Sequence, residues 1–149
     1  MIFDRSERDV KSAIKIRDEK VKFGAGLTQE EYDILERGFI TLNTINRIEN
    51  KQKEIKLLIN NIGYYNTPIA NKNWDENQYF LHSDLKRIVE NNEILKKAYY
   101  VFVNTPTNAN SETTFKNLNN IEQLLYDLEV MTRDMKSRFL KCGTFNCGG

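Results

Sequence analysis

The chain has 149 residues and a formal net charge of +1, with 22 basic residues against 21 acidic ones. This length suits one domain with a single core, and 29% charged with 40% hydrophobic residues is typical of a globular protein. Balanced charge provides no long-range field for collecting polyanions, so nucleic acids and anionic membranes are not the expected partners. The first residues lack the apolar core of a signal peptide, and no window approaches the roughly 20 apolar residues that span a bilayer. We therefore expect synthesis in the cytoplasm without secretion by a signal peptide.

Two shorter helices are predicted first. The sequence from Ser6 to Asp9 is similar to a capping box and predicts a helix to about Lys22, ended by Gly24-Ala25-Gly26. The sequence from Thr28 to Glu31 is a complete capping box and predicts a helix to Gly38.

Three longer helices are predicted over about 43–62, from a cap at Ser83 or Asp84, and over about 114–139. Their seam residues alternate in steps of three and four: Ile45, Ile48, Gln52, Ile55, Ile59 and Ile62; then Leu85, Ile88, Asn92, Leu95, Tyr99 and Phe102; then Leu118, Ile121, Leu125, Leu128, Thr132 and Met135. We expect an all-α fold, an irregular antiparallel bundle of three long and two shorter helices with a long central loop, from residues 1–139. The seams are also compatible with a self-associating coiled coil, although their width favours packing within one chain.

The residues that carry chemistry do not form a recognisable active site. His82 is the only histidine, and it directly precedes the predicted helix cap at Ser83. Cys142 and Cys147 match no zinc pattern, and no phosphate-binding glycine motif is present. We predict no catalytic residue, no cofactor and no metal. An enzyme or lysis factor would have to use His82, and it remains a rival hypothesis.

Candidate partner-binding residues lie in the long loop and near the C-terminal end. Trp74 and Tyr79 occupy the loop, where such aromatic residues either fold back over the bundle or anchor a partner. Residues 140–149 alternate bulky with small side chains and predict an extended tail, which is either a loose end or a strand that pairs with a neighbour. The candidates in and beside this tail are Phe139, Cys142, Phe145 and Cys147.

A phrase of apolar residue, Asn, any residue, Ile and Glu recurs along the chain. It runs from Ile45 to Glu49 and from Leu118 to Glu122, and a looser version runs from Leu85 to Asn91. Each version places polar side chains beside a buried stripe. From it we expect structural polar contacts, with Arg47 paired to Glu49 and Arg87 paired to Asp84 by charge-assisted hydrogen bonds between helices or subunits. Asn46 and Asn91 belong to the same structural polar set.

Several phrases, taken in order, carry a family resemblance. They are Phe3 to Val10, Leu27 to Glu31, Ile45 to Glu49, the loop residue Trp74, Ser83 to Ile88 followed by Asn91, and Asn120 to Glu122 followed by Leu125 to Leu128. In this combination the chain resembles a small structural protein, or N-terminal module, of the tails of phages and phage-tail-like particles that infect Gram-positive bacteria. The family tail often has Ser where this chain has Cys142 and Cys147. This departure leaves the redox state of the two cysteines open.

The resemblance implies a non-enzymatic component of a virion or tail-like particle. It implies a place at the baseplate or tail tip, where such a subunit can link receptor-binding fibres to the particle. The implied partners are other tail or baseplate proteins and further copies of the chain, with no nucleic acid and no membrane. The alternative is a small helical nucleic-acid-binding or regulatory protein, which would use the basic and aromatic run from Lys96 to Phe102. The seam positions of Tyr99 and Phe102 favour a core role for that run.

Overall fold

The computed structural model describes residues 1–24, 26–63, 68–75, 78–98, 106 and 113–142, of which 139–142 are described by their backbone alone. The described residues form five helices and no strand: α1 (Glu7–Phe23), α2 (Gln29–Gly38), α3 (Leu42–Asn61), α4 (His82–Lys97) and α5 (Phe115–Cys142). The predicted all-α class and helical bundle are confirmed. None of the described helices is long and apolar enough to cross a bilayer.

Helices α1 and α2 begin at the predicted caps. The Ser6 hydroxyl accepts a hydrogen bond from the Asp9 backbone N–H, and the Asp9 carboxylate accepts one from the Ser6 N–H at 2.7 Å. Thr28 and Glu31 form the same reciprocal pair at the start of α2. Such boxes satisfy amide groups that a helix start leaves without partners, and they involve only residues three apart. Both capping boxes can therefore be predicted from the sequence.

The first two helices form an antiparallel hairpin. Arg37 near the end of α2 donates to Asp9 near the start of α1 at 3.0 Å, and Lys20 pairs with Glu31 at 2.9 Å near the turn. The two helices approach closely at Gly38, where an added Cβ would lie 2.2 Å from the Ala13 Cβ. Only glycine fits this crossing point.

Helices α3, α4 and α5 enclose the main core. Its buried side chains are Ile45, Ile48, Ile55, Ile59, Leu85, Ile88, Leu95, Leu118, Ile121, Leu124, Leu125 and Leu128. Nearly all were predicted seam positions. Two polar seam residues, Gln52 and Asn92, are fully buried as well, and the Gln52 amide donates to the Asn92 side-chain oxygen at 2.7 Å. The polar interruption of the seam is thus matched across two helices.

The three long helices run in the same direction, and the predicted antiparallel arrangement is wrong in this respect. Contacts between α3 and α5 rise together along both helices, from Arg47 with Glu122 to Lys51 with Glu129 and then Glu54 with Arg133. The contacts between α3 and α4 rise in the same way. Antiparallel neighbours are the rule for short loops. Residues 62–81 and 98–114 are long enough, at about 3.3 Å per extended residue, to return along the roughly 30 Å of α3.

Two helix ends also differ from the predictions. The N-cap of α4 is Leu81, ahead of the predicted Ser83 or Asp84, and the Asp84 carboxylate accepts the Leu81 N–H at 3.0 Å from inside the first turn. Helix α5 continues to Cys142, so residues 140–142 are helical where an extended tail was expected. The remainder of that predicted tail, with Phe145 and Cys147, lies outside the described residues.

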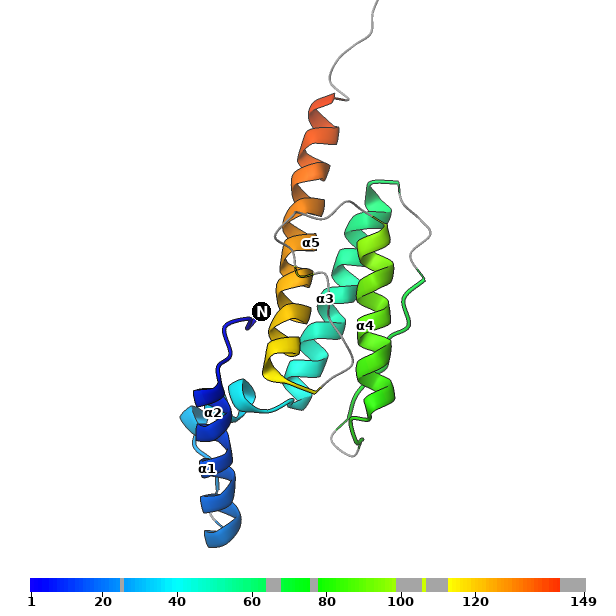
Figure 1. Ribbon diagram of the computed structural model, residues 1–149. Coiled ribbons are helices and arrows are strands. Elements are labelled where there is room, and N and C mark those ends of the chain that lie inside the picture. The colour runs from blue at the N-terminus through cyan, green and yellow to red at the C-terminus, as the bar shows by residue number, and fades with distance from the viewer. Residues whose placement is uncertain (25, 64–67, 76–77, 99–105, 107–112, 143–149) are drawn as a thin grey trace, which may run out of the picture.

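The molecule has two distinct ends (Figure 1). The hairpin of α1 and α2 extends from one end of the three-helix bundle. Helix α5 extends past the ends of α3 and α4 at the other end. This follows from length, because α5 has 28 residues whereas α3 has 20 and α4 has 16.

Candidate docking surface

The segment between α3 and α4 is fastened to the bundle as a strap, which we define as residues 68–75 and 78–81. Trp74 is half-buried and packs against the core, and its ring centroid lies 5.7 Å from that of Phe80. The Lys72 ammonium lies 4.1 Å from the Trp74 ring centroid. Of the two interpretations of this loop, the one in which Trp74 folds back over the bundle is confirmed.

The side chain of Glu49 on α3 binds both the strap and helix α4. This side chain is almost completely buried. One carboxylate oxygen accepts hydrogen bonds from Trp74 Nε1 at 3.1 Å and from Arg87 Nη2 at 2.5 Å, and the other accepts from the Lys72 backbone N–H at 2.8 Å. A buried carboxylate is stable only when its acceptor sites are filled and its charge is paired. Strap and helix α4 together fill those sites.

Asn91 of α4 provides a second attachment. Its side-chain oxygen accepts from the Ala70 N–H at 3.0 Å, and its amide group donates to the Ala70 carbonyl at 2.7 Å and to Gln52 at 3.0 Å. Arg87 also donates to the Ala70 carbonyl at 2.9 Å. The Asn91 side chain thus pairs with both backbone groups of Ala70, as a neighbouring strand would, and it fixes the start of the strap.

The far end of the strap presents apolar groups to solvent. Tyr79 is 87% exposed and Leu81 is 57% exposed, although Phe80 between them packs inward. His82, the next residue, is also exposed and is the first residue of α4. Exposed Tyr and Leu side chains on a backbone held in place are suited to a docking contact, since little freedom remains to be lost on binding.

A second buried glutamate, Glu122 of α5, holds the N-terminal arm. Arg5 donates to it at 3.2 Å with both side chains fully buried, and the Ile2 N–H donates to the same carboxylate. Arg47 of α3 donates to it at 2.8 Å and also pairs with Glu36 of α2. This one carboxylate therefore connects the arm, α3 and α5, and through Arg47 it connects the hairpin.

Glu49 and Glu122 occupy the same place in the recurring sequence phrase. Each follows the Ile of Asn-x-Ile-Glu, and each binds a segment that is not part of the three-helix core. In the looser third copy, Asn91 takes this role and Glu90 is exposed. The phrase thus marks the positions where the strap and the N-terminal arm bind the three-helix bundle. The sequence predicted only structural polar contacts there.

Two predicted ion pairs are revised by these contacts. Arg47 pairs with Glu36 and Glu122, and the expected pair with Glu49 is wrong. Arg87 lies 3.7 Å from Asp84, as predicted, but its shorter contact is with Glu49. Asn46 is half-buried on α3. The predicted basic and aromatic run is described only as far as Ala98, so Tyr99 to Phe102 lie outside the described residues.

The ion pairs along α3 and α5 shift the pKa values of the side chains that form them. Burial alone would lower the pKa of Lys51, but its contacts with Glu54 and Glu129 outweigh this effect and raise it. The pKa of Arg47 is raised in the same way by Glu122 and Glu36. All of these shifts favour the charged forms, which is the behaviour of structural ion pairs.

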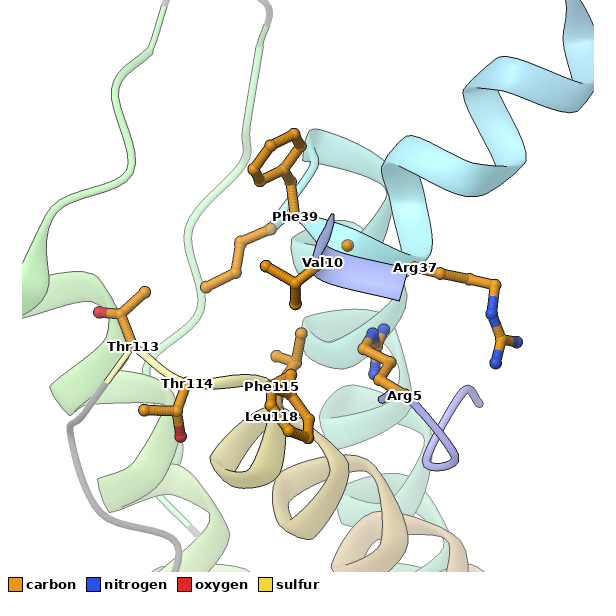
Figure 2. A pocket seen from close by; sticks show the side chains of 10 residues that line it. Arg5, Val10, Arg37, Phe39, Thr113, Thr114, Phe115 and Leu118 are labelled. Atoms are coloured by element: carbon orange, nitrogen blue, oxygen red, sulfur yellow. The ribbon is translucent and has the colours of Figure 1, made fainter. Parts of the chain in front are cut away.

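An apolar cleft of about 370 Å³ lies between the hairpin and the start of α5. Figure 2 shows Val10, Phe39, Phe115 and Leu118 around it, while the guanidinium of Arg37 points away. Only Thr113 and Thr114 add hydroxyl groups to its lining beside the two arginines at positions 5 and 37. The cleft separates two packed units and is the place where the hairpin meets the bundle.

Among the described residues, no group of three or more His, Cys, Asp or Glu side chains is placed to hold a metal ion. Comparison of the chain with protein-family models, with curated proteins and with solved structures finds no match.

Proposed function

We propose that this chain is a non-enzymatic structural subunit of a phage tail or phage-tail-like particle, at the baseplate or tail tip. The family resemblance in the sequence is the source of the particle assignment. The subunit would join neighbouring tail proteins, and in that position it can link receptor-binding fibres to the particle. Its localisation would be the host cytoplasm during synthesis and then the assembled particle.

The observation that carries a docking role is the strap. A non-helical segment is held on the bundle by buried contacts to Glu49 and Asn91, yet it exposes Tyr79 and Leu81. The fold commits two nearly buried polar side chains to positioning this backbone. A preformed apolar edge of this kind binds a partner with a smaller loss of conformational entropy than a free loop. We assign the strap as the contact with a neighbouring particle protein.

The experiment replaces Tyr79 and Leu81 together with Ser in the producing strain. Both side chains are exposed, so the variant should fold normally. Particles are purified on a density gradient, and the subunit is quantified by mass spectrometry against the other tail proteins. The proposal predicts a loss of at least ten-fold in incorporation.

A matched control replaces two exposed apolar residues elsewhere, Val21 and Phe23 on α1, with Ser. This control should be incorporated normally. Absence of the wild-type chain from purified particles would overturn the particle assignment. Equal incorporation of the strap variant and the control would overturn the role of the strap.

A further inference from the structure

In the sequence, the seam spacing of α5 continues through the last ten residues of the helix. Seam positions Leu128, Thr132 and Met135 are followed at steps of four and three by Phe139 and Cys142. Thr132 is buried and Met135 is half-buried, and the next three residues are exposed. Arg133 at its start contacts Glu54 of α3, and α5 then extends past the ends of α3 and α4 (Figure 1). We call residues 133–142 the overhang, and it measures about 15 Å along the helix axis.

The overhang is basic. It contains four basic residues and one acidic residue. Arg133 pairs with Glu54 and Glu129, and Arg138 pairs with Asp134. Lys136 is exposed, and no ion-pair partner lies within 4 Å among the described residues. A seam flanked by positive charge favours an apolar surface edged with carboxylates.

A surface that combines acidic with apolar groups lies at the opposite end of the same molecule. A cleft of about 470 Å³ lies between α2 and the start of α3, lined by Gln29, Tyr32, Asp33, Leu35, Glu36, Thr41, Leu42 and Asn43. Helix α2 carries four acidic residues and one basic residue. Its Tyr32 is 55% exposed and Glu30 is exposed, again with no ion-pair partner among the described residues. The lining is mixed: Tyr32, Leu35 and Leu42 supply its apolar part, and the Asp33 carboxylate supplies negative charge that matches the basic overhang.

We infer that the overhang of one copy docks into the cleft between α2 and α3 of a second copy. The overhang has a formal charge of +3, from four basic residues and one acidic residue, and α2 has a formal charge of −3, from four acidic residues and one basic residue. The overhang and the hairpin that contains α2 lie at opposite ends of the molecule (Figure 1). An overhang meeting another overhang would instead bring like charges together. The contact is therefore head-to-tail, and it generates a ring or a linear stack with the copy number set by the angle between neighbours.

This inference names a second copy as one partner of the subunit, and it rests on the proposed function only for its place in a particle. The contact is small, so we expect dissociation constants on the order of 10–1000 μM for the purified chain. Particle assembly would strengthen it by supplying many contacts at once.

The experiment uses the full chain in sedimentation velocity, at several protein concentrations and at 50 and 500 mM salt. Variant one carries Lys136→Glu and Arg138→Glu in the overhang. Variant two carries Glu30→Lys and Asp33→Lys on α2. The matched control carries Lys11→Glu and Lys15→Glu, which reverses two exposed charges on α1, a helix that contributes no residue to the cleft lining or to the overhang. Circular dichroism checks that all chains keep their helix content.

The wild-type chain and the control should associate as concentration rises, and salt should weaken this association. Each docking variant alone should associate at least about ten-fold more weakly, which corresponds to the loss of about two exposed charge contacts. An equimolar mixture of the two variants should regain association, because each reversed surface then meets its complement. A wild-type chain that stays monomeric at 1 mM overturns the inference, as does a variant that associates alone like the wild type. Both results are obtained without particles, so they leave the particle assignment to its own test.

Discussion

Replacing Glu49 with Gln tests whether one buried carboxylate fastens the strap. The substitution keeps size and shape but removes the charge and turns one acceptor into a donor. One Glu49 oxygen accepts from both Trp74 and Arg87, and the other accepts from the Lys72 N–H. A glutamine amide must therefore direct its N–H groups at one of these donors, so that at least one buried group loses its partner.

We expect a large loss of folding stability for a change of so few atoms. Removing one partner of a buried ion pair costs about 3–5 kcal/mol. Arg87 retains 21% side-chain exposure and can be partly hydrated after the change, which reduces this value. We expect Glu49→Gln to lower the free energy of unfolding by about 2–3 kcal/mol and the melting temperature by roughly 5–10 °C.

The assay follows urea unfolding by circular dichroism and by the fluorescence of Trp74, which is the only tryptophan. Native Glu49→Gln protein should emit at longer wavelength than the wild type, because the indole loses its buried acceptor and becomes more hydrated. Glu90→Gln is the matched control. It removes an exposed contact with Lys86 at 3.9 Å and should cost less than about 0.5 kcal/mol. A Glu49→Gln chain as stable as this control, with unchanged emission, would refute the role of Glu49.

Three further predictions concern the hairpin and the attachment of the N-terminal arm. Gly38→Ala should destabilise the hairpin by about 1–3 kcal/mol in thermal unfolding, because the new methyl overlaps Ala13; unchanged stability would contradict the close crossing. Hydrogen bonds from Ser6 and Arg37 lower the pKa of Asp9 from 3.8 to about 2. The stability advantage of the wild type over Asp9→Asn should thus be fully present above about pH 5 and be lost as pH falls through 3.8 toward and below 2; at this half-buried site solvent screening should keep it below about 1 kcal/mol. Glu122→Gln should increase amide hydrogen exchange at Ile2, and protection equal to the wild type would argue against its hold on the arm.

Local features of this fold can be predicted from sequence because their causes are local. The caps at Ser6 and Thr28 involve partners three residues away, and the apolar seams follow directly from helical spacing. The return of Trp74 to the bundle also follows, since a long ordered loop needs packing of its own. Helix direction does not follow from the seams. In this chain the two long connections permit the parallel arrangement, and loop length is the signal that could have indicated it.

The attachment contacts are harder to predict because their partners are distant. Arg5 and Glu122 are separated by 117 positions, and no local pattern joins them. The predicted pair of Arg47 and Glu49 could have been rejected from geometry, since residues two apart on a helix face different directions. What the sequence does carry is the repeated phrase, which places a Glu beside the seam at both attachment points. The function of these two Glu residues becomes clear only from the structure, which shows the strap and the arm bound to them.

The measurement that tests the central proposal most directly is quantitative mass spectrometry of purified tail particles, combined with chemical crosslinking. We expect a fixed copy number of this chain per particle, retained through high-salt washing, with crosslinks from the strap near Tyr79 to another tail protein. Absence of the chain from washed particles, or its presence without any fixed ratio to the other tail proteins, would contradict its role as a tail subunit.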